Sequence, residues 1–275
     1  MKRNQSYDTT KSIKYYFLIS HGFPFFITGL FMLIENSFYI SNPLYGELIY
    51  LGLLSPTFAA FFIIYYFYSK EERRNYWFSI IDFKRISWKW YLIIISLPIL
   101  IRFLAVVIDA SITANNFQFN ISPDMTLIYA IILLFFGPIP EELGWRGIAL
   151  PELQKKYGFN IAVLILGFMW AIWHLPLFVV EGTYQNQLGL FSPMFWNFML
   201  SALLTSVIYG VIYNKTNKSI LAVILFHYFG NLTGETFVMT SNAELISTVL
   251  RGVLALLIIV YYVKDTNNME NRYVG

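Results

Sequence analysis

The chain has 275 residues, of which 57% are hydrophobic and only 13% are charged, and its formal net charge is +3. So little charge cannot cover the surface of a soluble protein of this length. The absence of cysteine excludes disulfides, thiol nucleophiles and cysteine-ligated metal sites. No basic stripe occurs on a soluble domain, so we expect no nucleic-acid partner.

The apolar residues fall into blocks of about 20, the length at which a helix crosses a bilayer. We therefore predict an all-α, polytopic membrane protein with about eight transmembrane helices. The predicted segments are 15–34, 48–68, 90–109, 126–144, 159–180, 195–213, 220–238 and 245–263.

Lys and Arg residues collect in every second connection between these segments. Of the 19 cationic residues, only Arg102, Arg146 and Arg251 lie in or at the end of a predicted span. The others lie in the N-terminal arm, in the 69–89 loop, and after the fourth, sixth and eighth segments. Because cytoplasmic loops are rich in Lys and Arg, both termini are predicted to be cytoplasmic. The residue usage suits a low-GC bacterium, so the expected location is a bacterial plasma membrane, with lipids as neighbours.

The third segment carries two charged residues, Arg102 and Asp109, that are seven positions apart and so share a helical face. They could pair with each other or with lipid headgroups. We expect a structural role for both.

The fourth segment ends in two adjacent carboxylates. Glu142 and Arg146 are four residues apart and can form an ion pair along one helical face, whereas Glu141 points about 100° away. Pro138 and Pro140 interrupt the helix upstream, and such breaks are tolerated in a membrane where they line a cavity. Ionisable groups at membrane depth usually mark a functional site.

Two later segments add polar side chains at the same helical spacing. Trp170 and His174 are four apart in the fifth segment, and His227 and Asn231 are four apart in the seventh. A carboxylate beside a histidine can activate water. A histidine with an asparagine can donate hydrogen bonds to an oxyanion, each worth on the order of 3 kcal/mol. This set predicts hydrolytic chemistry.

A zinc ion held by Glu141, His174 and His227 is the alternative that the same residues leave open. The sequence has no HExxH motif of the common zinc proteases. Depth along the helices raises a conflict: at 1.5 Å per residue, Glu141 lies roughly 5–10 Å from the cytoplasmic face, but His174 lies roughly 20 Å from it.

These motifs resemble the CAAX protease and bacteriocin-processing (CPBP, or Abi) family of intramembrane proteases, which are related to type II CAAX prenyl endopeptidases. The family pattern EExxxR, aromatic-xxx-H and HxxxN or HxxxD is matched by EELGWR at 141–146, WAIWH at 170–174 and HYFGN at 227–231. Trp170 is a departure, since phenylalanine is commoner there.

The resemblance implies a membrane-embedded endopeptidase that acts on a membrane-associated peptide or protein. It assigns Glu141 and His174 to water activation, and His227 and Asn231 to the oxyanion. Glu142 and Arg146 become a supporting ion pair. The family has been described both as metal-independent glutamate proteases, which need no cofactor, and as metalloproteases. We favour the former, with Zn²⁺ as the alternative.

The predicted division of the chain has three parts. Residues 1–124 form three spans with an amphipathic cytoplasmic loop, residues 125–240 form the catalytic core of spans four to seven, and residues 241–275 form the last span and a cytoplasmic tail. Two other functions stay open: a non-catalytic immunity or scaffold protein of the same fold, and a proton-coupled transporter.

Overall fold

The computed structural model describes residues 8–113, 127–236 and 239–273. Within these ranges all regular elements are helical, and an isolated bridge joins Ile40 to Val180. The α-helices are α1 (Thr9–Glu35), α2 (Pro43–Gly52), α3 (Ser55–Phe67), α4 (Lys70–Ile81), α5 (Trp88–Thr113), α6 (Leu127–Phe136), α7 (Pro138–Gly144), α8 (Leu150–Trp173), α9 (Tyr184–Leu188), α10 (Pro193–Lys215), α11 (Ile220–Thr236) and α12 (Ser241–Tyr273). Three short helices of other types are η1 (Phe83–Arg85), η2 (Trp145–Ala149, a π-helix) and η3 (Leu175–Val179).

The described parts of all eight predicted apolar segments fall mainly on helices, and the all-α membrane fold is confirmed. In the described part of the chain, six stretches are long and apolar enough to cross a bilayer. The fourth and fifth predicted segments lie together in one of them, the 52-residue stretch Ile128–Val179. The seventh segment corresponds to α11, which has only 17 residues. The number eight therefore stays a prediction.

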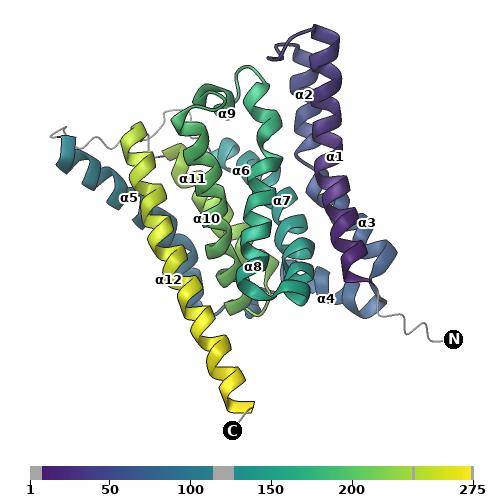
Figure 1. Cartoon of the computed structure of the whole chain (residues 1–275), viewed down its shortest axis with the longest axis vertical. Helices are drawn as coiled ribbons and strands as arrows, with labels where there is room; N and C mark the ends of the chain where they lie inside the picture. The colour runs from purple at the N-terminus through teal and green to yellow at the C-terminus, as the bar shows by residue number, and fades with distance from the viewer. Residues whose placement is uncertain (1–7, 114–126, 237–238, 274–275) are drawn as a thin grey trace.

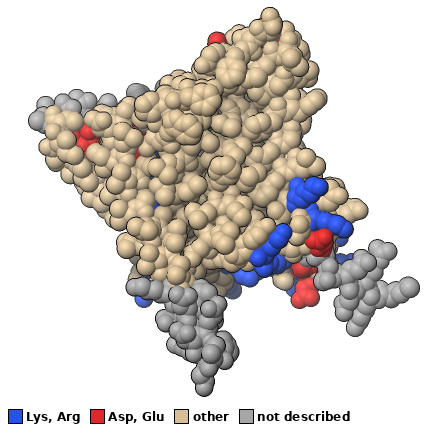
Figure 2. All heavy atoms as spheres, in the orientation of Figure 1, with Lys and Arg blue, Asp and Glu red and all other residues tan. Residues whose placement is uncertain are grey.

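The connections rich in Lys and Arg meet at one end of the bundle, the lower end in Figure 1. The 69–89 loop contacts the α10–α11 connection there, since Arg85 donates to the carbonyl oxygen of Asn217 at 3.2 Å. Most of the Lys and Arg atoms visible in Figure 2 lie at this end. The start of α1 and the end of α12 also lie toward it (Figure 1). That this end is cytoplasmic remains a prediction from charge; Lys2, Arg3 and the side chains of Lys264 and Arg272 lie outside the described residues.

A helical hairpin around Gly158 forms the centre of the bundle. Gly137 breaks the chain between α6 and α7, where Pro138 occupies the first position of α7, as suits a residue without an N–H. The helix then continues through η2 into α8 until Gly158, whose φ of 73° is open to glycine but strained for other residues. The chain turns there (Figure 1), and the rings of Trp145 and Trp173, one from each arm, lie 5.8 Å apart.

This hairpin removes the conflict in depth between the two proposed water-activating residues. The helix of the fourth segment does not end at Gly144, as we expected, but runs on to residue 157. Glu141 is thus 17 residues before Gly158 and His174 is 16 residues after it, which puts each about 25 Å from the turn.

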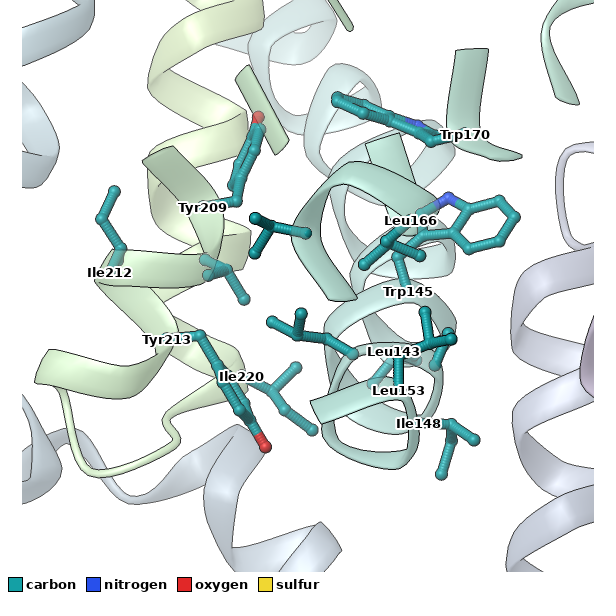
Figure 3. Packing of buried hydrophobic residues seen from close by; sticks show 14 of the residues in the cluster. Leu143, Trp145, Ile148, Leu153, Leu166, Trp170, Tyr209, Ile212, Tyr213 and Ile220 are labelled. Atoms are coloured by element: carbon teal, nitrogen blue, oxygen red, sulfur yellow. The ribbon is translucent and has the colours of Figure 1, made fainter. Parts of the chain in front are cut away.

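Apolar side chains hold the hairpin against α10 and α11. Figure 3 shows Leu153 and Leu166 of the hairpin in the same group of buried side chains as Ile212 and Tyr213 of α10. The helices approach one another closely at glycine residues, which have no side chain. A Cβ atom on Gly144 would overlap the carbonyl oxygen of Pro56 in α3. The core therefore fixes the position of the helical EELGWR segment, residues 141–146.

Charged residues near the other end of the bundle pair between helices. Arg102 of α5 forms an ion pair with Glu244 of α12, with Nη1 and Oε1 3.3 Å apart. Asp109 accepts a hydrogen bond from Thr240. The possible Arg102–Asp109 pair is thus replaced by two contacts that join α5 to the region where α12 begins. The predicted boundary at 124/125 lies outside the described residues, and the three-part division stays a prediction.

Candidate active site

One cavity of about 720 Å³ is lined by all four residues predicted to act in catalysis. Glu141 comes from α7, His174 follows the end of α8, and His227 and Asn231 come from α11. The first three are buried. Helix packing therefore brings together groups that are up to 90 positions apart in the sequence.

Trp170 connects Glu141 to His174. Its indole Nε1–H donates to Oε2 of Glu141 at 2.7 Å. Its carbonyl oxygen lies 2.8 Å from Nδ1 of His174, and the two rings meet edge to face with centroids 5.7 Å apart. Because a carbonyl oxygen can only accept, Nδ1 of His174 carries a proton in this contact. In the neutral ring, Nε2 is then left as an acceptor.

Glu142 contacts two basic side chains at once. Nη1 of Arg146 lies 2.9 Å and 3.1 Å from its two carboxylate oxygens, which confirms the expected i,i+4 ion pair. Nδ1 of His227 also contacts Oε1 of Glu142, at 2.9 Å. The side chains of Glu142 and Arg146 are completely buried. The carboxylate thus orients His227 as well as neutralising Arg146.

Two aromatic rings enclose the guanidinium of Arg146. Its Cζ lies 4.7 Å from the ring centroid of Trp170 and 4.2 Å from that of Tyr209 in α10. A guanidinium over an aromatic face gains electrostatic stabilisation, more so when it is removed from water. These contacts tie the ion pair to α8 and α10.

Asn231 lies one helical turn beyond His227 on α11, beside the break at Gly137. A Cβ on Gly137 would come 3.3 Å from Nδ2 of Asn231. The side-chain amide thus lies where the backbone of α6 gives way to α7. Both α11 residues line the cavity, so their hydrogen-bond donors can be offered to one bound group.

Three parts of this arrangement were missed in the sequence. In the sequence, Trp170 stands out only as a variant of the family's aromatic position, and its hydrogen bond to Glu141 is not evident. The contact between Glu142 and His227 joins residues that are 85 positions apart. Tyr209 is one of 20 tyrosines, and nothing in its neighbourhood distinguishes it. No local signal could have found it.

The residues named for a zinc ion are each engaged by a protein group. Glu141 accepts from Trp170, Nδ1 of His174 bonds a carbonyl oxygen, and Nδ1 of His227 bonds Glu142. Among the residues that the structure describes, no three His, Cys, Asp or Glu side chains form a group that could hold a metal ion. Each of these contacts uses one atom of the side chain and leaves Nε2 of both histidines and the second oxygen of Glu141, so zinc stays the alternative.

Comparison with known proteins supports the resemblance seen in the motifs. Residues 123–233 match the type II CAAX prenyl endopeptidase Rce1-like family. The chain is also 27% identical to CAAX prenyl protease 2 of Methanococcus maripaludis over 257 residues, covering 90% of this chain and 93% of that protein. With the apolar helices, these similarities support an integral membrane protein with intramembrane protease activity in general.

Proposed function

We propose that the protein cleaves a peptide bond in a membrane-associated protein or peptide by metal-independent, glutamate-based hydrolysis, because residues 123–233 match the type II CAAX prenyl endopeptidase Rce1-like family. The name of the Methanococcus relative makes a prenylated peptide with a C-terminal CAAX sequence the first substrate to test. A bacterial plasma membrane remains the proposed location.

Glu141 is the proposed general base. One of its oxygens accepts from Trp170, which leaves the other for a water molecule in the cavity. Nε2 of His174 accepts the second hydrogen of that water and so orients it. As the water oxygen bonds to the scissile carbonyl carbon, Glu141 takes a proton. It then gives this proton to the leaving nitrogen as the C–N bond breaks, yielding an acid and an amine.

His227 and Asn231 are the proposed donors to the oxyanion. The amide of Asn231 supplies an N–H without any change of charge. His227 supplies Nε2–H when its ring carries both protons, and Glu142 provides the counter-charge for that state at 2.9 Å from Nδ1. Donors held in place before the reaction cost no reorganisation when the negative charge develops.

The observation that carries this proposal is the convergence of Glu141, His174, His227 and Asn231 on one cavity. The test uses purified protein in detergent and a farnesylated CAAX peptide, with products identified by mass spectrometry. Wild-type protein is expected to release the C-terminal fragment, and His174→Ala is expected not to. An uncleaved peptide in all cases, together with unchanged membrane peptides in cells with and without the wild-type protein, would reject the proposal.

Metal independence has its own experiment. Protein treated with 1,10-phenanthroline and then dialysed is expected to keep its cleavage rate, and added Zn²⁺ is expected not to raise it. Loss of activity on chelation that is restored by stoichiometric Zn²⁺ would instead support the zinc alternative with Glu141, His174 and His227.

A further inference from the structure

Two arginines on the wall of the catalytic cavity have no part in the hydrolysis described above. Arg102 of α5 and Arg251 of α12 both line the same cavity as Glu141 and His227. Both lie within helices that are apolar enough to span a membrane. A cation in such a place costs free energy, so it is retained where a partner or a ligand compensates it.

Of the two guanidiniums, only that of Arg102 has a close carboxylate among the described residues. Nη1 of Arg102 lies 3.3 Å from Oε1 of Glu244. Nη1 of Arg251 donates to the hydroxyl of Ser201 at 2.6 Å. Within the described residues, no Asp or Glu oxygen lies within 4.0 Å of Arg251, and Glu235, also on the cavity wall, forms no ion pair with either arginine. Arg251 therefore retains donors for an anion that enters the cavity.

The arginines belong to one electrostatic cluster. Glu244 and Arg251 are seven residues apart on α12 and so share a face. Burial raises the pKa of the Tyr184 hydroxyl in the nearby α9; Glu244 raises it further, whereas Arg102 and Arg251 lower it. Both guanidiniums thus act on the same part of the cavity.

This cluster lies a short peptide's length from the proposed oxyanion donors. A Cβ on Gly234 of α11 would come 3.1 Å from Nη2 of Arg102. Gly234 is seven residues from His227, which is about 10 Å along the helix. An extended peptide covers about 10 Å in three residues.

We propose that Arg102 and Arg251 form a subsite that binds the C-terminal carboxylate of the peptide substrate, about three residues beyond the scissile bond. A cavity of this size holds a short segment, so a chain end is the carboxylate that fits it. The planar guanidinium matches a carboxylate, and the Arg251 donors become paired on binding. This inference rests on the proposed peptidase function and names the feature by which the substrate is recognised.

The experiment compares two fluorescent farnesylated CAAX peptides that differ only in having a C-terminal carboxylate or a C-terminal amide. Their dissociation constants are measured by anisotropy with Glu141→Gln protein in detergent, in which hydrolysis is blocked. The acid is expected to bind at least tenfold more tightly than the amide. Adding Arg251→Gln is expected to abolish that preference, and Ser201→Ala, which frees the Arg251 side chain, is expected to reduce it.

Arg74→Gln is the matched control, because Arg74 packs over Phe78 on α4 and does not line the cavity. It is expected to leave the preference unchanged. Thermal melting of each variant establishes that it is folded, and the neutral Arg251→Met replaces Arg251→Gln if the latter is not. Equal affinity for acid and amide before any arginine is changed overturns the subsite, as does a preference that survives removal of the Arg251 charge.

Cleavage by the wild-type protein separates this inference from the function on which it rests. Hydrolysis of both peptides at equal rates, with equal affinities, keeps the peptidase and rejects the subsite. Selective binding of the acid without cleavage of either peptide rejects the peptidase function while supporting a carboxylate-binding cavity.

Discussion

The indole Nε1 of Trp170 lies 2.7 Å from Oε2 of Glu141, although the two residues are 29 positions apart in the chain. The contact crosses the hairpin at Gly158, and it links the proposed base to the helix that carries His174. Trp170 also lies over the guanidinium of Arg146. Trp170 thus contacts Glu141 directly and also contacts Arg146, the ion-pair partner of Glu142.

Replacing Trp170 with phenylalanine tests the hydrogen bond while keeping an aromatic ring. A hydrogen bond to a charged group is worth roughly 1.5–3 kcal/mol. We expect kcat for peptide cleavage to fall by about tenfold or more, with little change in melting temperature. Trp170→Ala, which also removes the ring from Arg146, should lower both. Equal activity in wild type and Trp170→Phe would show that the indole N–H does not orient Glu141.

Glu141→Gln is expected to stop catalysis without unfolding the protein. The amide can still accept from Trp170 through its oxygen, but it cannot take a proton from water. A general base contributes about 10²–10⁴-fold, so kcat should fall by at least this factor. Thermal melting in detergent should stay close to wild type. Substantial residual cleavage would assign the base to another residue.

Unlike Glu141→Gln, Glu142→Gln is expected to lower the stability of the protein. It leaves Arg146 buried without its counter-charge, and breaking a buried pair in this way costs about 3–5 kcal/mol. The melting temperature should fall clearly. The double variant Glu142→Gln/Arg146→Met should recover part of the stability but not the activity, because His227 has lost its anchor. A double variant with full activity would contradict this role of Glu142.

Two glycines provide a test of the packing around the EELGWR segment. Gly144→Ala places a methyl group against Pro56 and the Tyr16 hydroxyl, and overpacking of this kind costs about 1–3 kcal/mol. Gly29→Ala in α1 is the control, since nothing lies within 4 Å of its added Cβ. Gly144→Ala should melt at a lower temperature than wild type, and Gly29→Ala should not. Equal melting of the two variants would mean that the close approach at Gly144 relaxes without cost.

The motifs that carry the proposed catalytic residues could be found in the sequence because each is local. A spacing of four residues brings Glu142 and Arg146 onto one helical face, and their ion pair follows directly. The contacts of Glu142 with His227 and of Arg102 with Glu244 could not be found in this way, because they join helices that are distant in sequence. The count of residues along the fourth segment also placed Glu141 too close to the end of its helix. Nothing in the local pattern showed that this helix continues through η2 to Gly158.

By itself the sequence determined the membrane-spanning helical class and the polar groups that the later helices carry. Apolar block length and four-residue spacing depend only on helix geometry and on the cost of charge in lipid. Only the tertiary structure decided that Glu141, His174 and His227 share one cavity with Arg102 and Arg251. That depends on where the chain turns and how closely the helices pack, and these are set by contacts between residues far apart in the chain.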